Sequence, residues 1–290
     1  MADIAQDAAL IADDEVLQAA SKLFVYLWNT AWKHAPGTAS GDADALHDMR
    51  VAVRRLRSAL QNFEGPKYEP LLSTRMRREF AKQRRELSRL GDALGAVRDF
   101  DVLDDYLRDY CKTRLNKRIR EVRGLAQFER FLQTERAAHF APMVKKLNRA
   151  QESGELRENF ARWALGLPGA AFTLESPLTL RDVAKIVIPR RIEEVRGFAP
   201  RLLDPRDPEG HHEMRKSLKR LRYSVEFFAP CAGDDLKPQL KTLTALQDLL
   251  GEMNDRHVLH LTAQRAFPPL TVEYSQEASV QFPPDVAQFL

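Results

Sequence analysis

Apolar residues recur at helical spacing along almost the whole chain. Met49, Val53, Leu56, Leu60 and Phe63 are separated by steps of three or four residues, which places them on one face of a helix. No run of alternating β-branched residues favours a sheet. The same spacing, with the turn residues between segments, predicts helices at 14–34, 44–63, 70–95, 99–111, 117–138, 142–152, 155–166, 179–203, 209–229, 235–251 and 254–265. The sequence therefore predicts an all-α fold, and short loops between amphipathic helices favour antiparallel bundles.

Proline and glycine mark the expected breaks and ends of these elements. Pro189 falls inside a predicted helix and should kink or divide it, because proline removes a backbone donor. Residues 1–13 are predicted to form an acidic tail, and residues 266–290, which contain two Pro-Pro pairs, an acidic extended or disordered tail.

Two phrases occur twice in the chain. Residues 47–57 and 212–222 share the pattern His-x-Met-Arg-x3-(Arg/Lys)-Arg-Leu-Arg, and residues 94–103 resemble residues 250–259. Such self-similarity indicates an internal duplication. We predict a first repeat at 14–111, a helical connector without counterpart at 112–170, and a second repeat at 171–265, within one domain spanning 14–265.

Basic residues form stripes beside the apolar seams. At about 100° per residue, the stripe of the first repeat lies well away from its seam. A third stripe of cations follows residues 75–89, although neighbouring cations repel one another. The candidate anion-binding residues are His47, Arg50, Arg54 and Arg57; Arg75, Arg78, Lys82, Arg85 and Arg89; His212, Arg215, Lys219 and Arg222; and Lys241. A solvent-exposed helix face is the alternative interpretation of any single stripe, but the repetition favours an anion-binding surface.

Composition narrows the class of protein. The chain has 290 residues, of which 44% are hydrophobic and 30% charged, with a net charge of +4. The net charge understates how basic residues 21–265 are, because residues 1–20 and 266–290 contain acids but no Lys or Arg. Two cysteines and the absence of a signal-like or membrane-spanning apolar run predict a cytoplasmic protein.

The roles of two histidines and two aspartates stay open. His47 and His212 begin the stripes, where an imidazole can donate a hydrogen bond to phosphate. Metal binding is their alternative role, but no cluster of metal ligands supports a particular ion. Asp99 and Asp255 follow a glycine and are interpreted as capping acids at the start of a helix. Orientation of neighbouring arginines by ion pairing is their alternative role.

The repeated phrases resemble the CHAD domain, the conserved-histidine α-helical domain, over roughly residues 14–265. The resemblance implies two four-helix bundles related by pseudo-twofold symmetry, a basic central cavity or surface, and binding of inorganic polyphosphate. It carries the family's histidines and basic residues over to the two repeated stripes and to Arg78, Lys82, Arg85 and Arg89. The second copy departs from the pattern at Lys219, Asn254 and His257, so the surface should be asymmetric.

The leading hypothesis is a non-enzymatic polyphosphate-binding protein, without a cofactor, that neutralises phosphate charge with its stripes. Polyphosphate granules and their associated proteins are the expected location and partners, and no membrane is expected. The alternatives are a metal-dependent phosphohydrolase that uses the motif histidines, and a nucleic-acid-binding protein. A nucleic-acid site typically interleaves aromatic residues with its cations, and these stripes contain none.

Overall fold

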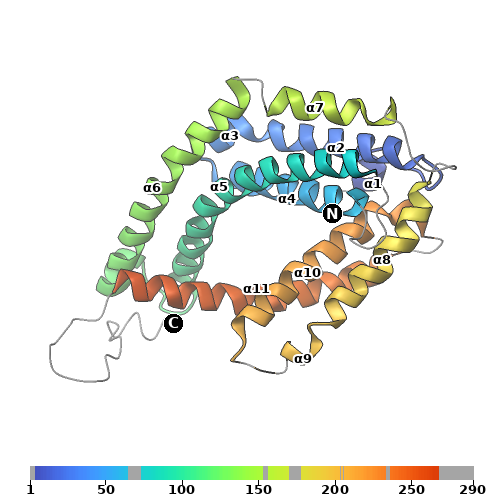
Figure 1. The fold of residues 1–290 in the computed structure, drawn as a ribbon. Coiled ribbons are helices and arrows are strands. Elements are labelled where there is room, and N and C mark those ends of the chain that lie inside the picture. Colours follow the sequence, from blue (N-terminus) through green and yellow to red (C-terminus); the bar gives the residue numbers. More distant parts are fainter. Residues whose placement is uncertain are drawn as a thin grey trace.

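Helices account for the regular secondary structure throughout the described chain (Figure 1). The computed structural model describes residues 4–64, 73–152, 156–169, 178–202, 204, 206–232 and 236–267. Within these ranges the sole β-type pairing is an isolated bridge between Glu15 and Thr179. The all-α prediction is confirmed. No described helix has an 18-residue window apolar enough to cross a membrane.

The described residues form eleven α-helices, which carry the labels of Figure 1. They are α1 (Ile4–Asp7), α2 (Val16–Lys33), α3 (Ala35–Ser40), α4 (Ala43–Glu64), α5 (Thr74–Thr113), α6 (Arg123–Glu152), α7 (Arg157–Leu165), α8 (Leu180–Arg196), α9 (Ala199–Leu202), α10 (Pro208–Phe227) and α11 (Lys237–Ala266). Short 3-10 turns lie at Ile119–Glu121, Leu167–Gly169 and Ala229–Cys231.

Three predicted breaks were wrong, because α5 runs on past Gly95, α6 continues through Pro142, and α11 is a single helix. Pro189 lies inside α8 and does not divide it. One glycine inside a helix costs only about 1 kcal/mol relative to alanine. In α5 the buried residues Leu90, Leu94 and Val97 continue across the glycine, so tertiary packing outweighs this penalty.

The first five long helices share one core. α4 packs between α2 and α5, α6 packs along α5, and α7 lies on α2. The apolar seam of α4 is fully buried in this core, as its spacing predicted. Residues 4–10, within the predicted acidic tail, also contribute: Ile4 and Ala5 are buried, and Asp7 accepts a hydrogen bond from the Tyr26 hydroxyl.

The remaining helices pack around α10, which contacts α8, α11 and α4. Its seam residues Met214, Leu218 and Leu221 are buried as predicted. α11 continues along the lower edge of the molecule to the base of α5 and α6 (Figure 1), where Leu259 and Ala263 share a second core with Leu107 and Phe128. The helices thus bring α4 and α10, the two helices with the repeated basic phrase, into direct contact. Residues 268–290 of the predicted C-terminal tail lie outside the described residues, and the duplication boundaries stay a prediction.

Candidate anion-binding site

The stripe of α4 faces a cavity of about 370 Å³ between α4 and α5. Because the opposite face of α4 carries the buried seam, Arg50, Arg54 and Arg57 are left partly exposed. All three line the cavity, together with Gly91, Asp92, Gly95 and Asp99 of α5. The cavity therefore has a cationic wall on α4 and a wall of glycines and carboxylates on α5.

Two glycines allow the arginines to lie flat against α5. A Cβ atom added at Gly95 would lie 3.4 Å from Nε of Arg50, and one at Gly91 would lie 3.3 Å from Nη1 of Arg57. The second repeat shows the same contact more loosely, with 3.6 Å between a Cβ at Gly251 and Nε of Arg215. The repeated Leu-Gly phrase thus provides the surface on which the repeated arginine rests.

The aspartates that follow these glycines pair with the arginines. Asp99 lies 3.2 Å from Nη2 of Arg50, and Asp255 lies 4.0 Å from Nη2 of Arg215. Both acids are inside long helices, so their interpretation as capping residues at a helix start was wrong. Asp92 adds a looser pair, 3.9 Å from Nη1 of Arg57. These carboxylates orient the guanidinium groups and compensate part of their charge.

The stripe of α10 divides between two roles. Arg215 and Lys219 face the stripe of α4, as their mutual electrostatic influence shows. Arg222 instead contacts neighbouring side chains of α10. Its guanidinium carbon lies 5.1 Å from the centre of the Tyr223 ring, and its Nε lies 3.6 Å from Glu226. Glu226 also accepts a hydrogen bond of 3.3 Å from Arg55 of α4. Arg222 therefore supports the α4–α10 junction.

Lys219 marks the point where the two stripes meet. Burial, followed by the charges of Arg54, Arg215 and Arg50, lowers the pKa of Lys219 to about 6, and Asp255 only partly offsets this effect. Burial and the charge of Arg54 likewise lower the pKa of Arg50, and the charge of Arg215 on α10 lowers it further. Neither Arg54 nor Lys219 has a hydrogen bond or ion pair with any residue in the described ranges. The site thus holds positive charge that the surrounding described residues do not neutralise.

The two motif histidines have different surroundings. His47 is exposed at the start of the α4 stripe, and burial together with the charge of Arg98 lowers its pKa. His212 is half-buried, and its Nδ1 lies 2.6 Å from Oδ1 of Asn254 on α11. Within the ranges that the structure describes, no group of three or more His, Cys, Asp or Glu residues is arranged to hold a metal ion.

The third predicted stripe lies apart from this cavity. Arg75, Arg78, Lys82, Arg85 and Arg89 are exposed on α5, but none lines the cavity between α4 and α5. Arg89 pairs with Glu86 at 2.6 Å and lines a different cavity, beside α6. Lys241 is exposed near the start of α11. The α4 and α10 stripes are therefore brought together, whereas the α5 stripe forms a separate basic face.

Sequence reasoning missed Gly91, Asp92 and Arg98 as parts of the site. Arg98 is close enough to lower the pKa of His47, after burial, and it lies 3.7 Å from Asp105. No repeat marked these three residues, because Gly91 and Asp92 precede the second phrase and Arg98 is replaced by Asn254 in its second copy. The pairing of Asp99 and Asp255 with arginines was signalled, because both acids recur with the charged first phrase. Capping explains Asp99 and Asp255 from the local sequence alone, so it did not predict that they pair with arginines of another helix.

Comparison with known proteins agrees with this architecture. The family model described as CHAD domain matches residues 26–264. The chain belongs to the CHAD domain family. A solved structure described as the CHAD domain from the plant Ricinus communis matches with 25% sequence identity and a TM-score of 0.67, covering 93% of this chain and 86% of that one. The search of curated proteins gave no match.

Proposed function

We propose that this CHAD protein binds inorganic polyphosphate where the stripes of α4 and α10 meet. The observation that carries the proposal is the convergence of Arg50, Arg54 and Arg215 on Lys219, which has no hydrogen bond or ion pair with a described residue. Burial and these charges disfavour the protonated form of Lys219 in the free protein, and a bound polyanion would favour it. Arginine suits such a ligand, because its planar fork donates paired hydrogen bonds to phosphate oxygens.

A chain of phosphates fits the arrangement better than a nucleic acid does. The cations follow one another along two adjoining helices, so successive phosphates can each meet a positive group. None of the residues lining the α4–α5 cavity is aromatic, and nearby Tyr223 is only 2% exposed. The site therefore offers charge without the stacking surfaces that single-stranded nucleic-acid sites use. Under this proposal the protein acts by binding, without catalysis, and polyphosphate granules are its expected location.

Competition distinguishes polyphosphate from nucleic acid. A fluorescent long-chain polyphosphate is bound to the protein and then displaced with unlabelled polyphosphate, single-stranded DNA or double-stranded DNA at equal phosphate concentration. We expect polyphosphate to compete most strongly. Equal or stronger displacement by either nucleic acid would contradict the proposal.

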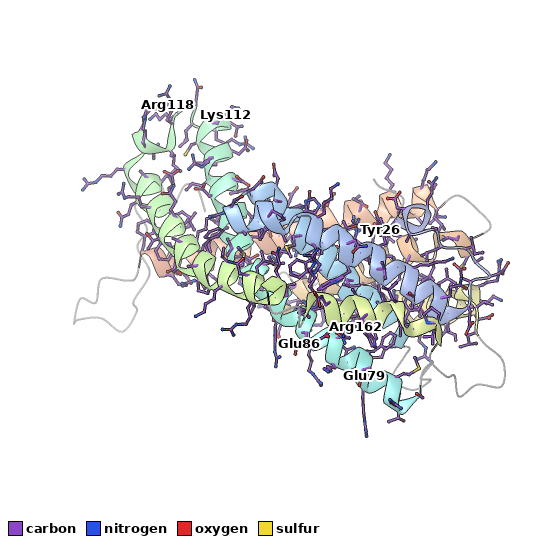
Figure 2. All side chains as sticks on the ribbon, turned by 90° about the horizontal axis from the view of Figure 1, so that it is seen from above. Tyr26, Glu79, Glu86, Lys112, Arg118 and Arg162 are labelled. Carbon is purple, nitrogen blue, oxygen red and sulfur yellow. The ribbon has the colours of Figure 1, made fainter. Side chains whose placement is uncertain are left out.

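A pair of matched variants tests the location. Arg54→Gln with Lys219→Gln removes the two groups at the centre, whereas Arg114→Gln with Arg120→Gln changes exposed cations near the end of α5. Figure 2 shows the neighbouring residues Lys112 and Arg118 together at that end of the molecule. A charge-assisted hydrogen bond is worth about 1.5–3 kcal/mol, so the central pair should weaken binding by at least about tenfold. Equal losses in both variants would mean that net charge alone determines binding.

A further inference from the structure

A second cavity lies on the other flank of α5, where α6 packs against it. Its volume is about 460 Å³, and its lining includes Arg89 and Leu90 of α5 and Lys145, Lys146 and Arg149 of α6. The α4–α5 cavity uses Gly91 and Gly95 of the same helix. Because successive residues turn by about 100°, the two sets point to different sides of α5. The two cavities are therefore distinct sites that share one helix.

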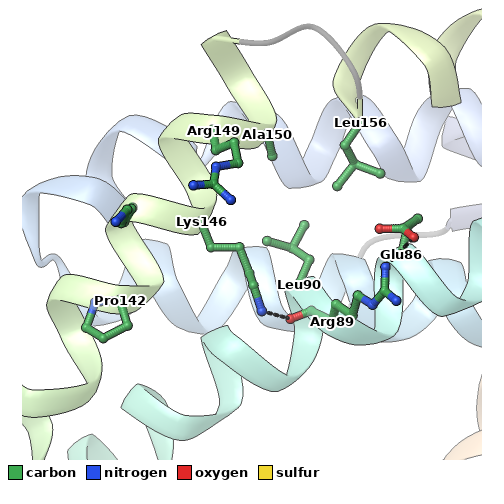
Figure 3. Close-up of a pocket in the computed structure, with 9 residues that line it drawn as sticks. Glu86, Arg89, Leu90, Pro142, Lys146, Arg149, Ala150 and Leu156 are labelled. Carbon is green, nitrogen blue, oxygen red and sulfur yellow. Dashed lines mark hydrogen bonds and ion pairs between the residues drawn. The ribbon is translucent and has the colours of Figure 1, made fainter.

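The second cavity combines an apolar floor with a cationic rim. Its accessible apolar lining consists of Pro142, which is exposed, and Leu156, which is half-buried, while Leu90 and Ala150 beside them are 2% and 8% exposed. Figure 3 shows Leu90 and Leu156 between the cationic side chains of α6 and the Glu86–Arg89 pair. Among the described residues that line the cavity, Arg89, Lys145, Lys146 and Arg149 are basic and Glu86 is acidic. A site for inorganic phosphate alone would have no use for the apolar floor.

The polar groups of the rim are arranged across the cavity. Lys146 reaches from α6 and donates a hydrogen bond of 3.1 Å to the backbone oxygen of Arg89 (Figure 3), which holds its ammonium group near α5. Lys145 is exposed and has no hydrogen bond or ion pair with a described residue. Glu86 pairs with Arg89 at 2.6 Å through one carboxylate oxygen, which leaves the other able to accept a hydrogen bond.

We propose that this α5–α6 cavity binds a nucleoside di- or triphosphate. The apolar floor would contact the base and sugar, the cations of α6 the phosphates, and Glu86 an amino group of the base. The cavity falls within the range of about 300–1,000 Å³ typical of small-molecule sites. Several cations match a ligand with several negative charges, which favours a nucleotide over a fatty acid that carries one.

Calorimetric titration of the full-length protein with Arg54→Gln and Lys219→Gln tests the ligand class, because the proposed site between α4 and α10 of the wild type would also take up inorganic triphosphate. The probes are ATP, inorganic triphosphate, adenosine and octanoate at constant ionic strength. We expect ATP to bind at least about tenfold more tightly than inorganic triphosphate, because burial of the base adds about 25 cal/mol for each Å² of apolar surface. Equal affinity for ATP and triphosphate would overturn the role of the floor. Saturation by octanoate without binding of ATP would overturn the nucleotide assignment.

Variants test the location independently of polyphosphate. Lys145→Ala with Lys146→Ala removes two rim cations, and Lys112→Ala with Arg130→Ala removes two exposed cations elsewhere on α5 and α6. The first pair should weaken ATP binding by at least about tenfold, since each charge-assisted hydrogen bond contributes about 1.5–3 kcal/mol, and the second pair should leave it nearly unchanged. Similar losses in both pairs would overturn the site.

The central-site variant separates this inference from the proposed function. Arg54→Gln with Lys219→Gln should leave ATP affinity unchanged, whether or not the wild-type protein binds polyphosphate. Loss of ATP binding in this variant would place the nucleotide between α4 and α10 and overturn the assignment to the α5–α6 cavity. Retained ATP binding in a protein that fails to bind polyphosphate would contradict only the proposed function.

Discussion

At the scale of single residues, the site depends on how burial and neighbouring charge act on one lysine. Lys219 occupies the position that corresponds to Arg54 in the repeated phrase. An arginine there would stay charged, because a guanidinium group is not deprotonated in proteins. Lysine can lose its proton when it is buried among cations, and the pKa of Lys219 is accordingly lowered to about 6. Replacement of arginine by lysine therefore makes the second copy sensitive to pH.

Binding of polyphosphate should therefore take up a proton at Lys219. Bound phosphate favours the ammonium form and raises the pKa above its free value of about 6. Between these two pKa values the complex holds a proton that the free protein lacks, so affinity should increase as pH falls from 8 to 6. Calorimetry at pH 7.5 in buffers of different ionisation enthalpy measures this uptake.

Lys219→Arg provides the control, because arginine keeps the charge without titrating. Proton uptake should decrease in this variant while polyphosphate affinity at pH 8 rises or is retained. We expect any uptake that remains in this variant to come from His47, whose pKa is also lowered. Uptake that is identical in wild type and Lys219→Arg would show that Lys219 is already charged in the free protein.

At the scale of elements, α5 has to remain helical and also has to let a side chain of α4 approach its backbone closely. Glycine weakens a helix interior, yet Gly95 is where the guanidinium group of Arg50 lies against α5. The Leu90–Leu94–Val97 seam keeps the helix intact across it. The glycine is thus explained by the approach of a side chain from α4, not by a turn.

Gly95→Ala should separate stability from binding. The added Cβ would lie 3.4 Å from Nε of Arg50, which shifts the guanidinium group by at most a few tenths of an ångström, so polyphosphate affinity should fall modestly. Thermal stability should hold or increase by up to about 1 kcal/mol, because alanine is the better helix former. Gly251→Ala is the matched control, with a looser 3.6 Å approach to Arg215 and a smaller expected decrease. Equal affinity in wild type and Gly95→Ala would argue against this placement of Arg50.

At the scale of the whole molecule, a buried polar network fixes α4, α8 and α10 relative to one another. The side chains of Asn62 and Ser224 are completely buried and joined by a hydrogen bond of 2.8 Å. Arg191 of α8 donates to Oδ1 of Asn62 at 3.1 Å. This network lies on the same pair of helices that carries the converging stripes.

Asn62→Ala should destabilise the fold by about 1–3 kcal/mol, because it leaves buried partners without a hydrogen bond. Chemical denaturation of the variant measures the change in the free energy of unfolding. Asn148→Ala on the exposed face of α6 is the control and should have little effect. If both variants unfolded alike, the network would contribute nothing to the junction.

The salt dependence of binding reflects the whole surface. Because bound phosphate chains release counterions, the logarithm of the affinity should fall linearly with the logarithm of salt concentration. For B-DNA the slope is about −0.9 for each phosphate that the protein neutralises, so Arg54→Gln should make the slope shallower by a similar amount. Fluorescence titrations between low and physiological salt measure it. Affinity indifferent to salt would contradict an electrostatic site.

The sequence by itself determined the helical class, the faces of the helices and the residues of the repeated stripes. These features follow from local spacing. Apolar residues that recur at steps of three and four residues lie on one face of a helix, and this face is buried in both α4 and α10. The family resemblance was likewise readable from the repeated phrases, and the match over residues 26–264 confirmed it.

Only the tertiary structure decided which stripes meet. The sequence gives the direction of Arg50, Arg85 and Lys219 around their own helices, but not which helix lies opposite. Packing places α10 against α4, turns the α5 stripe away from the α4–α5 cavity and pairs Asp99 with Arg50. It also keeps α5 helical through Gly95, because packing from neighbouring helices outweighs a local preference of about 1 kcal/mol. Contacts between distant segments depend on the summed packing of all the helices, which no local pattern records.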